Sequence, residues 1–265
     1  MWKVTDENYK YVECVLQKEK EKNIYILGDI AQYGLNGENV ECFAGGEVEN
    51  IQYVLMRFCN SYVLYMPVPN LAIKELYTFF QSKKIHCISG ERNTIKYVQE
   101  MFKHVHVINN KMLKIDGESV DVIKQNKSED IRILSVANLL EIQAFYCKIK
   151  EFKEKFSGDS GRKKIEEQFH NGKIVGLYKE GKLASVAALS AETEGFAMVD
   201  NVATAKEFRR QGLGYQLLKR ICFWEIREKG KEFLCVCCDD VRAENLYKKA
   251  GFQEIGIYSM AYPEE

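Results

Sequence analysis

A short glycine-bearing stretch, residues 209–214 with the sequence RRQGLG, has the residue types and the position of an anion-binding loop. It follows an apolar, strand-like run over 198–204 and precedes a helix-like run over 215–229. Where a strand turns into a helix, unpaired backbone N–H groups point outward, and the helix dipole adds about half a positive charge. Gly212 and Gly214 let the main chain approach a ligand where a Cβ would intrude. The stretch therefore suits a pyrophosphate, with an ordinary strand-to-helix turn as the alternative.

The spacing of the glycines excludes two common nucleotide loops and resembles a third. The chain has no G-x-x-x-x-G-K-[ST] motif, and Leu217 stands where G-x-G-x-x-G needs its third glycine. The stretch resembles the pyrophosphate loop [RQ]-x-x-G-x-[GA] of the GNAT superfamily of acyl-CoA-dependent N-acyltransferases, with Arg209, Gly212 and Gly214 at its three defined positions. Residues 243–252 continue the resemblance, because they look like the closing helix of that family and its L-Y-x-x-x-G-F ending. The second half of the chain is thus similar to GNAT enzymes.

The resemblance implies that an acyl-CoA, in the first place acetyl-CoA, is the acyl donor. Its pyrophosphate would accept hydrogen bonds from the N–H groups of the loop, with Arg209 or Arg210 as counter-charge unless both are solvated surface residues. Its pantetheine arm would pair along the preceding strand edge like an added strand, and the N–H of Val202 would polarise the thioester carbonyl. The cofactor-binding residues implied in this way are Val202, Ala203, Thr204, Arg209, Arg210, Gln211, Gly212, Leu213, Gly214 and Tyr215.

Tyr247 stands where many GNAT members carry a tyrosine that protonates the leaving CoA thiolate, so it is the implied catalytic residue. A phenol with a pKa of about 10 suits that step and stays protonated at neutral pH, although packing beside the sulfur is the alternative. Seven residues earlier, Asp240 replaces the asparagine of many relatives; it can cap a helix but cannot donate a hydrogen bond while ionised. The general base stays open among Glu192, Glu194, Asp200 and water, because strand alternation does not say which side chain points inward.

Composition and charge exclude several other classes of protein. The 265 residues are 46% apolar and 29% charged, which is typical of a globular chain rather than a disordered one. Lys plus Arg equals Asp plus Glu at 38 each, so charge favours neither nucleic acid nor an anionic membrane as a partner. No apolar run approaches the ~20 residues of a membrane span, and the first residues do not resemble a signal peptide. These features predict a cytoplasmic protein and leave a homodimer open.

The nine cysteines and four histidines form no recognisable metal or disulfide pattern. No C-x-x-C pair occurs, and an odd number of cysteines in a chain without a signal peptide favours free thiols. The run FLCVCC over 233–238 is predicted to be a buried strand that uses cysteine as a small apolar residue. His104 and His106 could share a strand face but lack a third ligand, so no metal site is predicted.

The order of the elements predicts two α/β domains, 1–125 and 126–265. The first is expected to contain helices over 5–22 (capped by Thr5 or Asp6), 24–33, 71–81 and 93–102, and strands over 40–43, 51–58, 62–66, 85–88 and 105–112. The second is expected to contain helices over 139–152, 165–170, 215–229 and 243–249, and strands over 131–134, 173–178, 182–191, 196–204, 233–238 and 253–260.

The fold class follows from this order and from the resemblance. It is α/β, with a GNAT-like mixed, mostly antiparallel sheet flanked by helices in the C-terminal half and a smaller α/β domain before it. The first domain is either a degenerate copy of the same fold without the pyrophosphate loop or an unrelated α/β domain. Gly45 and Gly46 are expected to separate two strands, and Pro67 and Pro69 to end a third. Residues 157–161, SGDSG, are expected to be a loop that is either a lid beside the acceptor or a plain connector.

The leading functional interpretation is an N-acetyltransferase that transfers the acetyl group of acetyl-CoA to a primary amine of a small molecule by direct attack. One alternative is an amino-acid N-acyltransferase resembling glycine N-acyltransferase. Another is a non-catalytic acyl-CoA sensor that has kept the loop and lost turnover. The predicted partners are acetyl-CoA and an amine acceptor, without nucleic acid, membrane or metal.

Overall fold

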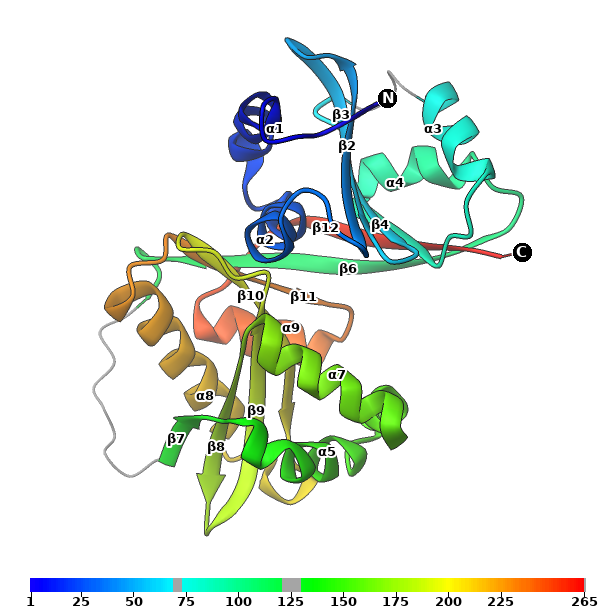
Figure 1. Cartoon of the computed structure of the whole chain (residues 1–265). Helices are drawn as coiled ribbons and strands as arrows, with labels where there is room; N and C mark the ends of the chain where they lie inside the picture. Colours follow the sequence, from blue (N-terminus) through cyan, green and yellow to red (C-terminus); the bar gives the residue numbers. More distant parts are fainter. Residues whose placement is uncertain (69–72, 121–129, 265) are drawn as a thin grey trace. The chain divides into compact units, whose positions relative to one another are not determined.

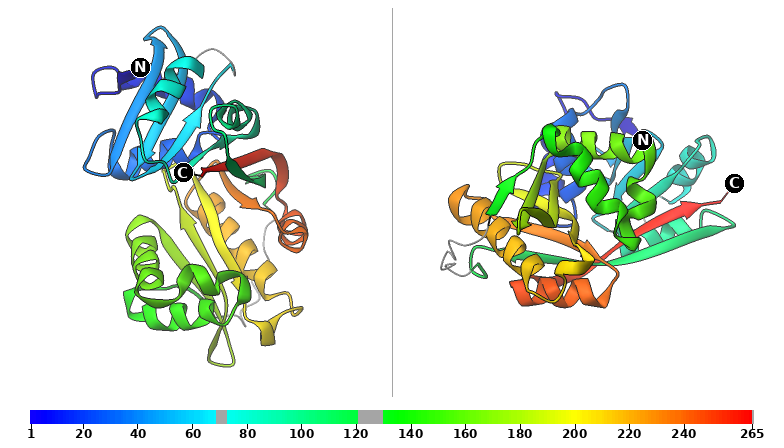
Figure 2. Two further views of the ribbon diagram at one scale, coloured as in Figure 1. Left: turned by 90° about the vertical axis from the view of Figure 1, so that its right-hand side faces the viewer. Right: turned by 90° about the horizontal axis from the view of Figure 1, so that it is seen from below.

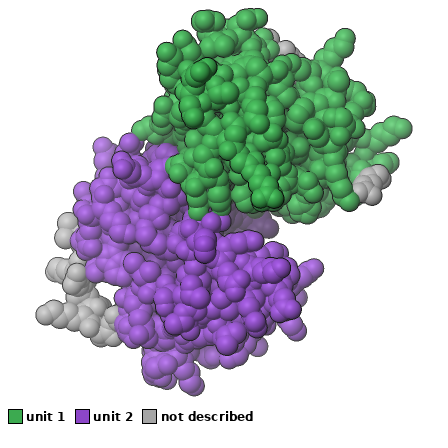
Figure 3. Space-filling model, in the orientation of Figure 1, with its two compact units in different colours: residues 1–112, 255–265 green, residues 113–254 purple. Residues whose placement is uncertain are grey.

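The computed structural model of the chain divides into two compact units (Figure 1; Figure 3). It describes residues 1–68, 73–120 and 130–264. The first unit comprises residues 1–112 and 255–265, and the second comprises residues 113–254. The domain boundary predicted at 125/126 lies outside the described residues, as do Pro69 and the start of the helix predicted over 71–81.

The first unit is a sheet with helices on both faces (Figure 1). Its strands are β1 (Trp2–Lys3), β2 (Val40–Glu47), β3 (Asn50–Phe58), β4 (Ser61–Tyr65), β5 (Cys87–Glu91), most of β6 (Val105–Asp116) and most of β12 (Gln253–Pro263). Its helices are α1 (Tyr9–Leu16), a 3-10 turn over Gln17–Glu19, α2 (Ile24–Tyr33), α3 (Ile73–Gln81) and α4 (Arg92–Gln99). The strand order is β1-β2-β3-β4-β5-β12-β6, and β4 runs parallel to β5.

The core of the first unit lies between its sheet and helices α3 and α4. Leu76 and Phe80 on α3 and Ile95 and Val98 on α4 are at most 2% exposed. Their spacing of three and four residues puts each pair on one helix face, where it packs against apolar strand residues such as Leu64. The apolar periodicity that predicted these helices is therefore also what joins them to the sheet.

The second unit has the same layered construction, with α5–α7 on one face of its sheet and α8 and α9 on the other (Figure 1; Figure 2). Its strands are β7 (Asp130–Ile133), β8 (Lys173–Lys179), β9 (Lys182–Ser190), β10 (Phe196–Thr204), β11 (Phe233–Cys238) and the last residues of β6. Its helices are α5 (Leu139–Cys147), α6 (Lys150–Phe156), α7 (Gly158–Asn171), α8 (Leu213–Cys222) and α9 (Val241–Ala250). Short 3-10 turns cover Val136–Asn138 and Lys206–Phe208, and a π-helix over Phe223–Glu228 extends α8. The strand order is β6-β11-β10-β9-β8-β7, with β10 parallel to β11.

The predicted apolar stripe on the helix after the glycine loop is confirmed. Leu213, Leu217, Leu218 and Ile221 are buried, and Trp224 packs against the same core while partly exposed. Strands β10 and β11 and helix α2 have the bounds that the sequence predicted, because each is a mostly apolar run of ordinary length. The mixed, mostly antiparallel sheet flanked by helices also confirms the predicted fold class.

Several of the expected boundaries of helices and strands were wrong. The first helix begins at Tyr9 with Asn8 as N-cap, and neither Thr5 nor Asp6 is the cap. Gly45 and Gly46 do not separate strands, because both lie inside β2, where the register with β3 shifts between them. Gly46 has a φ of +88°, a conformation that a β-bulge accommodates and that glycine adopts without strain.

The loop expected over 157–161 is also wrong, because α7 begins at Gly158. A Cβ on Gly161 would lie 2.0 Å from the backbone carbon of Phe156, so this glycine allows the end of α6 to pass against the first turn of α7. The helix expected over 139–152 is likewise divided into α5 and α6, with Ile149 in extended geometry between them. The sequence SGDSG therefore forms a tight helix junction rather than a lid.

The last strand of the chain was expected in the second domain, yet residues 255–263 of β12 belong to the first unit. There β12 pairs with β5 through the register Tyr258↔Glu91 to Ala261↔Ile88. The hydroxyls of Ser89 and Tyr258 lie 3.0 Å apart in the same pair of strands. Alternation along the chain predicts that a strand exists, but its partner depends on long-range pairing that the local pattern does not contain.

Candidate active site

Strand β10 separates from β11 halfway along its length. The parallel register between the two strands ends at Val199↔Val236, whereas the antiparallel register with β9 continues at Ala203↔Val186 and Thr204↔Ser185 after a bulge. Asn201, inside the bulge, has a φ of +50°. Residues 202–204 therefore have a strand partner on one edge only within the described part of the chain. That free edge is where the sequence analysis expects the pantetheine arm.

The glycine loop joins β10 to α8 and leaves the start of that helix uncapped. Gly212 is the N-cap residue with a φ of +80°, and no side chain caps the helix. A Cβ on Gly212 would meet no atom within 4 Å, so that side of the loop is open. A Cβ on Gly214 would instead lie 3.0 Å from Thr204 Oγ1, inside the packing between α8 and the sheet. The two glycines thus have different reasons to lack a side chain.

Polar side chains from three elements surround the loop. Arg209 Nε donates to the carbonyl of Thr204 at 3.1 Å, and its guanidinium lies 3.8 Å from Glu151 of α6. Lys179, at the end of β8, donates to Gln211 Oε1 at 2.6 Å. The ring of Tyr215 lies 5.1 Å from Lys249 Nζ. Lys179 and Glu151 were not expected from the sequence, because they approach the loop only through the fold.

Asp200 stands out among the three carboxylates considered as a general base. It directly precedes the bulge, and it accepts a hydrogen bond from the Ser190 hydroxyl. Burial raises the pKa of its carboxyl above the ordinary value, and the Ser190 bond and the Lys155 charge only partly oppose this shift. A carboxyl whose pKa is moved upward toward neutrality has the property that a general base needs.

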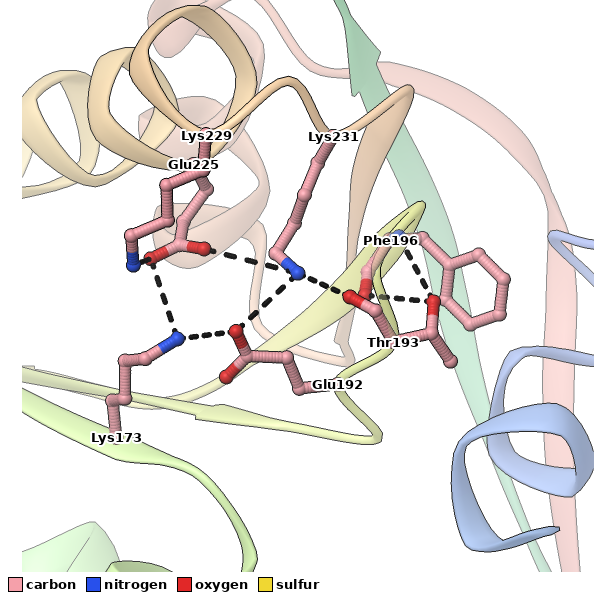
Figure 4. A network of polar contacts seen from close by, with 7 residues as sticks. All are labelled: Lys173, Glu192, Thr193, Phe196, Glu225, Lys229 and Lys231. Atoms are coloured by element: carbon pink, nitrogen blue, oxygen red, sulfur yellow. Dashed lines mark hydrogen bonds and ion pairs between the residues drawn. The ribbon is translucent and has the colours of Figure 1, made fainter. Parts of the chain in front are cut away.

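Glu192, the second candidate, is bound in an ion cluster at the turn before β10 (Figure 4). It pairs with Lys173, and its Oε1 lies 3.3 Å from Nζ of the buried Lys231. Burial alone would raise the pKa of Glu192, but the hydrogen bonds and charges of the two lysines outweigh it and lower the pKa. Glu225 of the π-helix, 2% exposed, joins the same lysines and Lys229. This cluster ties the β9–β10 turn to the π-helix, and it makes Glu192 a poor proton acceptor.

Tyr247 lies on α9 and is 5% exposed. Burial raises its pKa, and the nearby Cys238, Asp200 and Cys237 add to the shift in that order. The fold therefore brings Tyr247 into the electrostatic neighbourhood of Asp200, whereas Glu194 lies exposed in the turn before β10. Of the three carboxylates, Asp200 is the one whose charge acts on Tyr247.

Asp240 caps α9, as its position in the sequence suggested. Its carboxylate accepts the backbone N–H of Arg242 at 2.6 Å and also pairs with the guanidinium of that residue. These hydrogen bonds lower the pKa of Asp240 to about 2. The carboxylate is thus ionised at neutral pH and serves the helix end, where a negative charge is favourable.

Three residues at the bulge were missed by the sequence analysis. The hydroxyl of the buried Tyr146 donates to the Asn201 carbonyl at 2.9 Å, and Lys155 Nζ donates to Asn201 Oδ1 at 2.8 Å. Tyr146 also stacks on Phe156 with ring centroids 4.3 Å apart. One signal was available: Asp200-Asn201 interrupts an apolar strand, and asparagine is the non-glycine residue that most readily adopts positive φ. Nothing local marked Tyr146 or Lys155.

None of the nine cysteines, all of them in the described part of the chain, forms a disulfide bond. Among the residues that the structure describes, no group of three or more His, Cys, Asp or Glu side chains could hold a metal ion. None of the described helices is both long and apolar enough to cross a membrane.

Comparison with known protein families agrees with this geometry. Residues 138–252, from the residue before α5 to the residue before β12, match the model of the acetyltransferase (GNAT) family. The second unit is a GNAT acetyltransferase domain. The match covers the bulged strand, the glycine loop and Tyr247 in one segment, and it makes the chain an acyltransferase. Members of the family use an acyl-CoA as acyl donor, which fits an uncapped helix start beside a free strand edge.

Solved structures resemble the chain over almost its whole length. An X-ray structure of a Drosophila protein has a TM-score of 0.73 at 13% identity and covers 99% of this chain and 98% of its own. A tandem GNAT protein from the clavulanic acid biosynthesis pathway has a TM-score of 0.63 at 9% identity, with coverage of 99% and 98%. A GCN5-related N-acetyltransferase from Kribbella flavida has a TM-score of 0.60 at 17% identity, with coverage of 91% and 96%. A search of curated proteins found no match. At these identities the likeness concerns the fold, and the tandem protein supports a two-domain GNAT architecture.

Proposed function

We propose that the GNAT domain transfers the acetyl group of acetyl-CoA to a primary amine of a small-molecule acceptor. The observation that carries the proposal is that Asp200 lies where β10 and β11 separate and that its charge acts on the buried Tyr247. Next to them lie a free strand edge and an uncapped helix start, which suit pantetheine amides and a pyrophosphate. A donor thioester bound along this edge would present its carbonyl carbon beside the bulge.

The reaction is direct attack of the neutral amine on the thioester carbonyl carbon. The N–H of Val202, which follows the bulge, would stabilise the oxyanion of the tetrahedral intermediate. Asp200 accepts the proton that the amine loses, directly or through a water, because its raised pKa suits that role. The C–S bond then breaks and the sulfur leaves as a thiolate.

Tyr247 donates its phenolic proton to the departing sulfur. Burial raises the pKa of Tyr247, so the group stays protonated throughout the neutral range. A thiolate that emerges in the same buried setting is destabilised in the same way, so burial raises the pKa of both groups and does not by itself oppose the proton transfer. The phenolate recovers its proton from water before the next cycle.

The assignment of the cofactor-binding residues stays a prediction, and the geometry supports it to a different degree at each position. The geometry favours the N–H groups at the start of α8 and the edge of residues 202–204. Arg209 is the better placed of the two arginines, because its guanidinium already lies at the loop, bonded to the Thr204 carbonyl. Arg210 contributes mainly through its backbone, which has a φ of +60°.

The identity of the amine acceptor distinguishes the leading proposal from an amino-acid N-acyltransferase, and turnover of any acceptor distinguishes it from a sensor. Lys155 places positive charge beside Asp200, which would attract the carboxylate of an amino-acid acceptor. Amino acids therefore belong in the panel of amines to be tested. A sensor without turnover is disfavoured, because it would have no need for a buried tyrosine beside Asp200. Location in the cytoplasm and the homodimer stay predictions.

The test is acetyl-CoA turnover by the full chain with a panel of amines, amino acids and polyamines, followed by the release of free thiol. We expect thiol release that depends on one class of amine, together with one acetylated product identified by mass spectrometry. A set of acyl-CoA donors of increasing chain length measures the acyl preference in the same assay. Tight acetyl-CoA binding in calorimetry without thiol release for any amine would favour the sensor and contradict the proposal.

A further inference from the structure

A lysine of the protein itself reaches the bulge of β10. Lys155 lies on α6, and its Nζ donates to the side chain of Asn201 at 2.8 Å. The ring of Phe156 lies 5.3 Å from the same nitrogen. Asp200 and Lys164 are the charged groups that act on it. The ε-amine is therefore held at the one irregular point of β10.

The surroundings of Lys155 favour the neutral amine more than an ordinary surface position does. Burial of the ammonium group lowers its pKa, the charge of Asp200 opposes that shift, and the charge of Lys164 adds to it. The net direction is downward, so a larger fraction is unprotonated at a given pH. The neutral amine is the form that attacks a thioester. The residue as a whole nevertheless keeps solvent-exposed surface, so its amine also has room to move.

The position proposed for the donor brings the thioester to the same place. Asn201, which holds Lys155, immediately precedes Val202, whose N–H is the proposed partner of the thioester oxygen. Asp200, the proposed proton acceptor, immediately precedes Asn201. The residue that binds the Lys155 amine, Asn201, is thus flanked in β10 by the proposed base, Asp200, and by the proposed oxyanion donor, Val202.

We propose that Lys155 is a self-acylation site, modified by the acyl-CoA bound in its own domain when no acceptor amine is present. The ε-nitrogen attacks the thioester carbonyl carbon and a C–N bond forms. The C–S bond breaks, Asp200 accepts the proton lost by nitrogen, and the thiolate is protonated to free CoA. The product is an amide on Lys155, and no other reactant is needed. This inference rests on the proposed position of the acyl donor but not on the identity of the acceptor.

Acylation of Lys155 would reduce amine transfer. The amide has no positive charge, so the attraction between Lys155 and Asp200 is lost. The added acyl group also extends into the space beside the bulge, where an incoming amine must approach. The domain would therefore become slower when acyl-CoA is abundant and its acceptor is scarce, and the modified lysine would record that state.

The first experiment measures where the chain becomes acetylated. The full chain is incubated with acetyl-CoA and no amine, and the acetylation rate of each lysine is followed by peptide mass spectrometry. Lys153, exposed on the same helix, is the matched control. We expect Lys155 to react at least about tenfold faster than Lys153, because a bound donor acts at high effective concentration. Excess unacylated CoA should remove that difference. Equal rates at the two lysines, or a fast rate that CoA does not suppress, would overturn the proposal.

The second experiment measures the consequence with two variants. After incubation with acetyl-CoA, wild type and Lys153→Arg should lose amine-transfer activity, whereas Lys155→Arg should keep whatever activity it starts with. Loss at the same rate in Lys155→Arg would contradict the regulatory role. If no amine is turned over but Lys155 is acetylated and CoA suppresses it, the proposed function fails and this inference stands. If amines are turned over normally while Lys155 stays unmodified, the proposed function stands and this inference fails.

Discussion

In both units three antiparallel strand pairings lead into a parallel one. They are β1–β2, β2–β3, β3–β4 and then β4–β5 in the first unit, and β7–β8, β8–β9, β9–β10 and then β10–β11 in the second. Helices also fall in matching places, with α3 and α8 inside the parallel crossovers and α4 and α9 after them. The first unit therefore repeats the plan of the GNAT domain, which favours the degenerate copy over an unrelated fold.

The units differ just past the last pair of each parallel register. In the second unit Val199↔Val236 is followed by Asp200 and a bulge. In the first unit Val63↔Ser89 is followed by Leu64, which is 1% exposed, and the five residues of β4 include none with positive φ. A Cβ on Gly90 of β5 would lie 2.3 Å from the Leu64 carbonyl oxygen. The strands of the first unit stay in contact at the point where those of the GNAT domain separate.

A second difference lies in the helix after the parallel pair. Glu91 caps α4 by accepting from the Asn93 N–H, as Asp240 caps α9 by accepting from the Arg242 N–H. Seven residues after the cap, the first unit has the fully buried Val98, whereas the second has Tyr247. The two units therefore share the layered scaffold, whereas the carboxylate, the phenol and the strand separation that we propose for catalysis lie in the second unit.

The largest effect is expected for Tyr247→Phe, which makes this position as inert as Val98 while keeping the ring and its packing. Positioned acid catalysis contributes ~10²–10⁴-fold, so kcat should fall by that order with KM for acetyl-CoA within a few-fold. Steady-state kinetics with a reactive amine make the measurement. A loss confined to KM would make Tyr247 a cofactor contact, and an unchanged kcat would mean that the thiolate takes its proton elsewhere.

Asp200→Asn should lower kcat/KM by about 10²-fold, the low end for a positioned base, because water can replace it in part. The wild type should gain activity as pH rises through the raised pKa of Asp200, and the variant should lose that limb of its pH profile. A profile with the same acid limb in both proteins would show that another group is the base. Lys173→Met, which disturbs the Glu192 cluster instead, is the control and should leave the acid limb in place.

Asp200→Asn should also have a pH-dependent effect on stability. Because the pKa of Asp200 is raised in the folded state above its ordinary value of 3.8, the folded chain binds more protons than the unfolded chain between the two values. Stability present at low pH is therefore lost as pH rises through the folded pKa. Asn carries no such titration, so the Tm of Asp200→Asn relative to wild type should rise from pH 4 toward neutrality. A Tm difference that is independent of pH would contradict the burial of Asp200.

Gly212→Val should weaken acetyl-CoA binding at least tenfold, about 1.4 kcal/mol, because a side chain would enter the open side of the loop. Calorimetry on the folded variant makes the measurement, and unchanged affinity would contradict the loop assignment. Gly214→Val was expected from the sequence to act in the same way. In the structure that side chain would press on Thr204, whereas a valine at Gly212 would be strained by the φ of +80°, so we expect both variants to have a lower Tm in addition to weaker binding.

Gly90→Ala should have the smallest effect on the cofactor. The added Cβ would collide with the Leu64 carbonyl and destabilise the first unit by about 1–3 kcal/mol or more, measured as a lower Tm. The affinity for acetyl-CoA should stay within twofold, roughly 0.4 kcal/mol, because we propose that the first unit holds no cofactor. Weaker binding in this variant would indicate that the first unit takes part in the cofactor site.

Local sequence pattern alone determined much of this protein. The bounds of α2, β10 and β11, the apolar stripe of α8 and the cap at Asp240 were all predicted, because each depends on residues within one or two turns or strands. The glycine loop and Tyr247 were likewise singled out, because a motif of fixed spacing carries them. The order of elements, together with the resemblance of these motifs to the GNAT superfamily, then sufficed for the GNAT-like fold class.

Only the tertiary structure decided which residues meet at the bulge and where the chain's last strand belongs. The sequence left Glu192, Glu194 and Asp200 equal as bases, and only the fold places Glu192 among lysines and Asp200 beside Tyr247. Tyr146 on α5 and Lys155 on α6 each reach Asn201 across more than forty residues of chain. Strand β12 pairs with β5 although its own helix, α9, lies in the other unit. Strand partners and side-chain encounters of this kind depend on long-range contacts, and those have no signature in the local spacing of residues.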